Sequence, residues 1–288
     1  MKKISVISGC INKAISIVKS KAKGPLQETG YNAAMAVELP TLLNKRVGLL
    51  GNAHFGGCYI HQSPRASYFG PDGKTKTCEV GDLLTIYHQV VNGYDYYNAA
   101  LIQWKIMKTG KEILSGPSLI QLNLYRYWPK FSLSSKGGSY DITPKSISPG
   151  AQYGLIIPTS QMLYTTCPKE TLEIVDSVSF ARFILNLMKW QTGRPFDLDS
   201  QNENDEWSQF VSALIRASLA KVFTSKYHGQ VNVPRTSKDI LNMIANKGLT
   251  LKEVEEKGED ENEAISILYI SLSEETTVSS NIAKEDHR

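Results

Sequence analysis

The middle of the chain consists of short apolar or alternating runs. Between about residues 40 and 165, stretches rich in Val, Ile, Tyr and Thr are separated by Gly, Pro, Asn and Asp, and this punctuation is typical of strands. The expected strands are 46–51, 57–62, 83–91, 99–108, 118–128, 131–135, 140–143 and 153–159. Because no helical segment separates them, the pattern favours an antiparallel sandwich or barrel over a parallel sheet.

The first residues follow a different period. Apolar side chains recur every three or four positions, at Ile4, Ile7, Ile11, Ile15 and Val18, while most of the lysines lie off this stripe. The spacing predicts an amphipathic helix, which Gly24 and Pro25 would end. A basic helix of this kind either lies on an anionic membrane or packs against the protein's own core.

Helical spacing returns after Pro168. One helix is expected from Ile174 to Met188 and a second after Asn204, where Asp205 and Glu206 would complement its positive end. A third is expected from Thr236 to Gly248. Large apolar side chains in the first two should pack against the β domain or a partner chain: Phe180, Phe183, Leu187, Trp207 and Phe210.

These patterns predict an α+β protein in which a jelly-roll-like antiparallel β sandwich precedes a helical segment. The expected divisions are a basic helix and linker (1–34), the β domain (35–168), the helical segment (169–249) and an acidic, partly disordered tail (250–288).

Charge divides the chain in two. Residues 1–150 carry 18 Lys and Arg against 8 Asp and Glu, a net charge of about +10, whereas residues 151–288 carry 14 against 20, about −6. A basic half suits a polyanion or an anionic membrane surface, although a solvated basic surface with no ligand gives the same composition. Four dispersed cysteines indicate reduced thiols in an intracellular protein.

The stretch His54–Arg65 is the strongest candidate for a metal or catalytic site. His54, Cys58, His61 and Cys78 offer ligands that zinc accepts, and Cys58 is a candidate nucleophile. However, in a strand the Cys58 and His61 side chains point to opposite faces. No nucleophile elbow, phosphate loop or helical ligand pair accompanies them. We therefore expect a strand here, with no catalytic residues, metal or cofactor.

Two stretches combine basic and aromatic residues, 104–111 and 125–130. Aromatic rings stack on unpaired bases while cations follow the phosphates, so such stretches are typical of single-strand binding. The expected nucleic-acid contacts are Lys105, Lys108, Lys111, Arg126 and Lys130. The alternative is that the aromatic side chains fill the core and the lysines lie on solvated edges.

The segments HFGGCYIHQSP (54–64) and YRYWPKFSLSS (125–135) resemble, in order and separation, two strand motifs of the thirty-kilodalton superfamily of plant-virus cell-to-cell movement proteins. The resemblance covers about residues 45–160. Its motif positions are His54, Gly56, Pro64 and Pro129. The family's aspartate has no clean counterpart, because Asp82 precedes the strand 83–91 and Asp95 follows it.

The resemblance implies a viral, non-enzymatic jelly-roll protein that binds single-stranded nucleic acid such as RNA. It further implies association with host membrane in the cytoplasm, action at plasmodesmata and self-association into a homo-oligomer. Two other functions are compatible with the residues: a viral matrix or nucleocapsid-type structural protein, and a zinc- or thiol-dependent enzyme.

Overall fold

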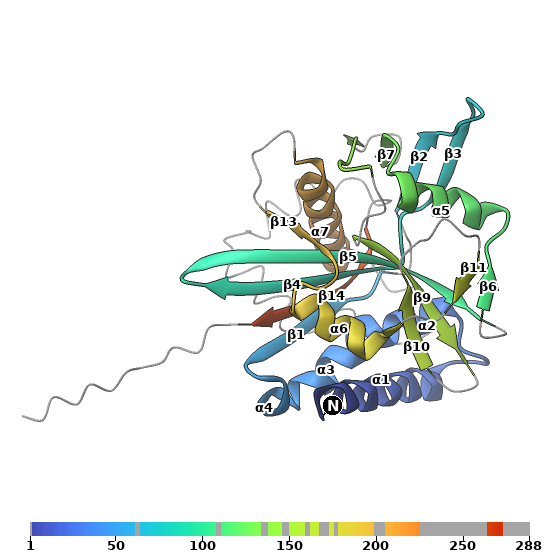
Figure 1. The fold of residues 1–288 in the computed structure, drawn as a ribbon. Coiled ribbons are helices and arrows are strands. Elements are labelled where there is room, and N and C mark those ends of the chain that lie inside the picture. The colour runs from blue at the N-terminus through green and yellow to red at the C-terminus, as the bar shows by residue number, and fades with distance from the viewer. Residues whose placement is uncertain are drawn as a thin grey trace, which may run out of the picture.

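A mixed eight-stranded sheet lies at the centre of the protein (Figure 1). The computed structural model describes residues 2–60, 64–107, 111–133, 138–145, 150–158, 162–166, 173–175, 178–198, 205–224 and 264–272. The sheet order is β1 (Ala53–Cys58), β14 (Ser266–Leu272), β4 (Leu83–Val91), β5 (Tyr94–Ile106), β9 (Ala151–Ile157), β10 (Met162–Thr166) and β12 (Val178–Ser179). A further strand, β13 (Arg194–Phe196), pairs with β5.

The expected antiparallel jelly roll is not confirmed. Two pairings of the large sheet, β14 with β4 and β5 with β9, are parallel. Strands joined by a tight hairpin run antiparallel, as β4 and β5 do, but β14 and β9 reach their neighbours from distant parts of the chain and are free of that constraint. The coarser expectation of a mixed helix and sheet protein is confirmed.

Two smaller sheets complete the β structure. One contains β3 (Thr75–Glu79), β2 (Arg65–Phe69), β7 (Phe131–Leu133) and β8 (Ser139–Tyr140), and the other pairs β11 (Glu173–Val175) with β6 (Lys111–Ile113). All pairings within these two sheets are antiparallel.

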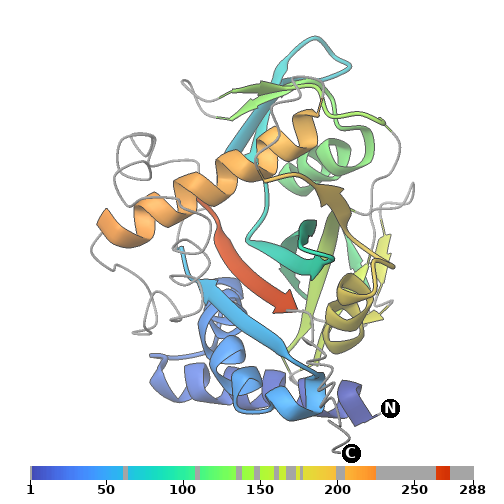
Figure 2. The same ribbon diagram turned by 90° about the vertical axis from the view of Figure 1, so that its left-hand side faces the viewer.

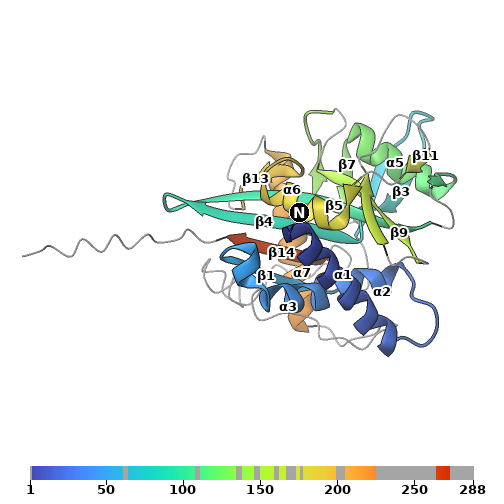
Figure 3. The same cartoon turned by 60° about the horizontal axis from the view of Figure 1, so that its bottom comes forward.

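N-terminal helices and α6 cover one face of the large sheet (Figures 1 and 3). They are α1 (Lys2–Lys21), α2 (Glu28–Ala33), the π-helical turn η1 (Ala34–Glu38), α3 (Leu39–Asn44), α4 (Val47–Leu50) and α6 (Phe180–Met188). The apolar stripe of α1 is buried here, so the predicted helix is confirmed and packs on the protein's own core. None of the described helices is long and apolar enough to cross a membrane.

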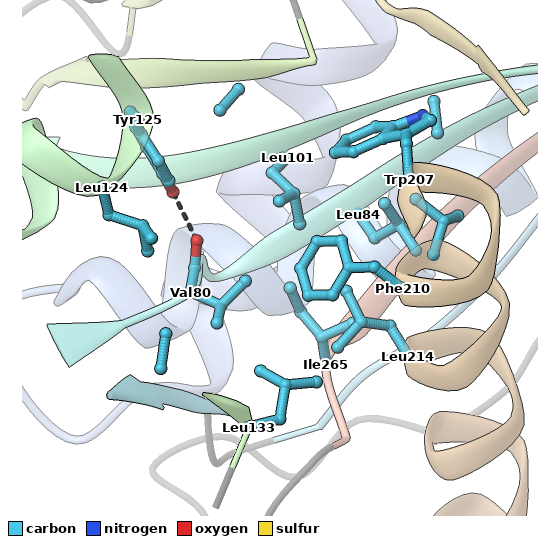
Figure 4. Close-up of a cluster of buried hydrophobic side chains, with 14 of the residues drawn as sticks. Val80, Leu84, Leu101, Leu124, Tyr125, Leu133, Trp207, Phe210, Leu214 and Ile265 are labelled. Atoms are coloured by element: carbon cyan, nitrogen blue, oxygen red, sulfur yellow. Dashed lines mark hydrogen bonds between the residues drawn. The ribbon is translucent and has the colours of Figure 1, made fainter. Parts of the chain in front are cut away.

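The opposite face is covered by α7 (Glu206–Thr224), α5 (Pro117–Tyr127) and the four-stranded sheet (Figure 2). Phe210 and Leu214 of α7 meet Leu84 and Leu101 of the large sheet, and Tyr125 donates a 2.6 Å hydrogen bond to the Val80 carbonyl (Figure 4). The five large apolar side chains expected to pack against the sheet are all buried: Phe180, Phe183, Leu187, Trp207 and Phe210. That prediction is confirmed.

Two predicted strands are helices. Residues 47–50 form α4, which ends where Gly51 adopts φ +81°. Residues 117–127 form α5, although Leu122 and Leu124 alternate with polar residues as in a strand. Pro117 fits the first turn of a helix because it needs no amide partner there. The strand expected at 83–91 is β4, with the predicted bounds.

The helical segment expected at 169–249 is not confirmed, because β11, β12 and β13 lie within it. The helix expected from Ile174 starts only at Phe180, where the Ser179 side chain accepts a hydrogen bond from the Arg182 amide. Residues 266–272, inside the range assigned to an acidic tail, form the interior strand β14. The helix expected at 236–248 and the acidic residues 250–263 lie outside the described residues.

A candidate anion-binding site

The basic residues expected to contact nucleic acid do not form one exposed surface. Lys130 is exposed and Lys105 is half-buried, but Arg126 is only 6% exposed. Lys111 starts β6, and its side chain lies outside the description, as does the whole of Lys108. The role of these five residues stays a prediction, with Arg126 covered by protein.

The aromatic residues of the same stretches are mostly in the core. Trp104 and Tyr125 are fully buried, as is Trp128, which packs edge-on against Trp207 at 5.7 Å between ring centroids. Of this set only Tyr127 is exposed, at 57%. Buried rings cannot stack on an external base, so the alternative in which these aromatics fill the core describes them correctly.

His54 and Cys58 lie on β1, as predicted. Cys58 and Ile60 enter one core cluster and Tyr59 enters the other, as predicted for these three residues, although β1 ends at Cys58 and not at the expected residue 62. Burial raises the pKa of Cys58 to about 12, and burial also raises the pKa of Cys78 to about 12. Burial therefore disfavours the thiolate, the nucleophilic form, at both side chains. Among the described residues, no group of three or more His, Cys, Asp and Glu is placed to hold a metal ion; His61 lies outside them.

The four motif positions of the resemblance are spread over three parts of the fold. His54 is exposed on β1, whereas Gly56 is buried beside it. Pro64 precedes β2, and its carbonyl accepts a 2.8 Å hydrogen bond from the Val80 amide. Pro129 follows α5, so the segment 125–128 before it is the end of a helix and not the strand that the resemblance implies.

A cluster of polar side chains around His88 lies on the α7 side of the large sheet. His88 Nε2 is 2.6 Å from Asp95 Oδ1, and His88 Nδ1 is 2.7 Å from the Tyr269 hydroxyl and 3.3 Å from Ser271 Oγ. The order Ser, His, Asp is that of a hydrolase triad. However, Tyr269 is the closer partner of Nδ1, and the Ser271 distance exceeds the usual 2.6–3.2 Å range between nucleophile and base. These contacts join β4, β5 and β14.

The helical side of the sheet contains a cavity of about 780 Å³. Its walls come from the start of α1, the end of α4, the outer half of β4, α6 and the last residue of β14. The wall residues are mainly apolar, including Ile4, Leu50, Leu185, Met188 and Leu272. This volume lies within the roughly 300–1,000 Å³ typical of small-molecule sites.

Four cations surround this cavity. Lys2 and Lys3 come from the first turn of α1, Arg182 lies in the first turn of α6, and Lys189 is the residue that caps the end of α6. All four are exposed, and none of the described residues that line the cavity is acidic. The first turn of α1 likewise has no acidic residue, so its partial positive charge adds to the field of the side chains. The arrangement favours a negatively charged ligand.

Exposed aromatic side chains extend the same face. In the β4–β5 hairpin, Tyr94 and Tyr96 stand opposite Val91 and Gln89, which line the cavity, and opposed residues of an antiparallel pair project to one face. Tyr94 is 70% and Tyr96 is 48% exposed. Trp190, 39% exposed, donates a 3.3 Å hydrogen bond to Gln89. We call these three rings and the four cations the basic-aromatic face.

Sequence reasoning missed this face because its parts are distant in the chain. The lysines of α1 were recognised as lying off the apolar stripe, and the seven-residue spacing of Arg182 and Lys189 is a helical signal. Nothing in the sequence placed α6 beside the start of α1. No family model, curated protein or solved structure matches this chain.

Proposed function

We propose that the protein is a non-catalytic binding protein for single-stranded nucleic acid, and that the basic-aromatic face is its contact surface. The observation that carries this proposal is the gathering of Lys2, Lys3, Arg182 and Lys189 around one cavity with no acidic residue among its described lining. Phosphate neutralisation by such cations supplies the sequence-independent part of nucleic-acid affinity.

The exposed rings support this proposal by providing what cations alone lack. Tyr94, Tyr96 and Trp190 are accessible aromatic surfaces beside the cations. An unpaired base stacked on an aromatic side chain contributes about 1–3 kcal/mol, with little dependence on which base it is. The proposed ligand is therefore a single strand bound without strong sequence preference.

The test compares two sets of four cations in filter binding of oligodeoxythymidylate across a salt series. One variant replaces Lys2, Lys3, Arg182 and Lys189 with Gln, and its matched control replaces Lys105, Lys108, Lys111 and Lys130. Each phosphate contact contributes about 0.7 to the salt slope on single strands, so the first variant should lower the slope by up to about 3. The control should lower it less.

Removing aromatic rings separates stacking from charge. Tyr94→Ala with Tyr96→Ala should weaken binding at least about tenfold while the salt slope stays unchanged. Phe69→Ala is the control, because Phe69 is 76% exposed on β2, outside the basic-aromatic face. If the salt slope falls only in the control variant at Lys105, Lys108, Lys111 and Lys130, the nucleic acid binds to the stretches predicted from sequence. Equal slopes in all proteins would refute the proposal.

The wider role is a second part of the proposal. We propose that the chain acts as a viral cell-to-cell movement protein, associated with host membrane and self-assembling on nucleic acid. The supporting observations are the two sequence motifs in family order and the basic first half. The jelly-roll arrangement of that family belongs to this proposal and not to the observed topology.

A further inference from the structure

The cavity has an apolar interior that is not needed to bind a nucleic-acid strand. Phosphates need the cations at its edge, and bases need the exposed rings, but neither needs an apolar interior. Yet Leu50 is buried in the wall, and Ile4, Leu185, Met188 and Leu272 are half-buried around it. Concave apolar surface of this kind is typical of a site that encloses a hydrophobic ligand.

We propose that this cavity binds a single-chain anionic amphiphile, an alkyl chain that ends in a phosphate or carboxylate group. The chain would contact the apolar walls contributed by α1, α4, α6 and β14. The head group would lie among Lys2, Lys3, Arg182 and Lys189 at the edge. Oxygen atoms of a phosphate accept several charge-assisted hydrogen bonds at once, which suits a site with four cationic side chains.

The polar groups in the wall favour an alkyl chain over a nucleobase. Asn52, Tyr87 and Gln89 carry the uncharged polar side-chain groups among the described lining residues. Gln89 Oε1 already accepts the hydrogen bond from the Trp190 indole. A base enclosed here would leave polar edges without partners, at a cost of about 1–3 kcal/mol for each group. An alkyl chain has no such groups.

The head-group cations also belong to the basic-aromatic face. If that face binds nucleic acid as proposed, an amphiphile in the cavity neutralises the charges that the strand requires. Linkage then makes each ligand weaken the other by the same factor. This competition rests on the proposed function, whereas occupation of the cavity does not.

Direct binding is measured by calorimetry with octyl and decyl phosphate below their micellar concentrations. If the chain is buried, each added methylene should raise the affinity about fourfold, so decyl phosphate should bind about sixteenfold more tightly than octyl phosphate. Inorganic phosphate tests the head group alone, and decyltrimethylammonium tests a chain of the same length with the opposite charge. Neither should bind measurably.

Two variants locate the ligand. Arg182→Gln with Lys189→Gln should weaken decyl phosphate binding at least about tenfold by removing charged hydrogen-bond donors. Leu185→Trp should abolish it by filling the cavity. Leu49→Trp is the matched control, because Leu49 is exposed on α4 and is not a lining residue. Thermal melts of all the variants identify any that do not fold, and the charge variant alters only exposed side chains.

Several results would overturn the amphiphile site. They are equal affinity for octyl and decyl phosphate, binding of decyltrimethylammonium, binding only at micellar concentrations, or undiminished binding by both the charge variant and a folded Leu185→Trp protein. Failure of the nucleic-acid proposal is recognised separately. In that case oligodeoxythymidylate does not bind, while the chain-length dependence and the variant effects on decyl phosphate remain.

Discussion

The carboxyl group of Asp82 illustrates how a single residue responds to its surroundings. It accepts hydrogen bonds from Gln103 Nε2 at 2.5 Å and from the Trp104 amide at 2.7 Å. Burial raises its pKa to about 7, the Trp104 amide opposes this rise, and Glu79 and Glu28 add to it. Sequence marked Asp82 only as a candidate for the family aspartate. Its burial beside β5 depends on contacts that no local pattern encodes.

This shift makes stability depend on pH in a definite direction. A carboxyl group ordinarily titrates near 3.8, so between about pH 4 and 7 the folded protein holds a proton that the unfolded chain has lost. Asp82 therefore lowers the free energy of unfolding as pH rises through this window. The decrease in the free energy of unfolding between pH 5 and pH 8 should be at least about 1 kcal/mol smaller in Asp82→Asn than in the wild-type protein, as measured by urea denaturation.

Asp72 provides the control for this experiment. It is an exposed carboxylate whose pKa is lowered mainly by its hydrogen bond from Lys76. Asp72→Asn should therefore leave the decrease in the free energy of unfolding between pH 5 and pH 8 unchanged. The prediction is contradicted if the free energy of unfolding changes by the same amount between pH 5 and pH 8 in the wild-type protein and in Asp82→Asn.

Among the elements, α1 and α5 mark where pattern reasoning succeeds and fails. The spacing of Ile4, Ile7 and Ile11 predicts a helix, because a strand would place Ile4 on the face opposite to Ile7 and Ile11. In α5 the alternation of Leu122 and Leu124 matches a strand equally well. The deciding interactions are tertiary, since Gln121 and Tyr125, one turn apart, bond to the backbone carbonyls of Glu79 and Val80.

The strand β14 leads to an element-scale prediction. It lies between β1 and β4, and Ile267, Leu268 and Ile270 are fully buried. A chain that ends at residue 263 would leave β1 without its partner in the large sheet and β4 paired only with β5, and it would open both core clusters. We expect that truncated chain to lose its cooperative thermal transition in circular dichroism.

A second truncation controls for removal of the C-terminus as such. A chain that ends at residue 273 loses Glu274 and all later residues but retains the whole of β14. It should melt cooperatively, within a few degrees of the full chain. If the chain ending at 263 melted like the full protein, β14 would be dispensable and the interpretation of residues 250–288 as a tail would hold for the strand too.

On the scale of the whole molecule, the sequence located elements such as α1, β4 and α7 but not their neighbours in space. The bounds of β4 follow from alternation and turn residues that are local. The parallel pairing of β14 with β4 joins residues about 180 positions apart, and no local pattern encodes it. The candidate site has the same origin, because Lys2 and Lys189 meet only after α1 and α6 pack on one face.

The wider biological role is a property of the intact chain, and it is tested in a leaf epidermal cell. A fluorescent fusion of the full protein should collect in puncta at the cell wall and spread to neighbouring cells. The variant with Gln at Lys2, Lys3, Arg182 and Lys189 should spread less, because these exposed cations are the proposed nucleic-acid contacts. The variant of Lys105, Lys108, Lys111 and Lys130 is matched in charge and should spread more than the first variant, because it leaves the basic-aromatic face unchanged. A diffuse cytosolic signal from the parent would remove the movement role, while a salt slope reduced in vitro would leave the nucleic-acid site in place.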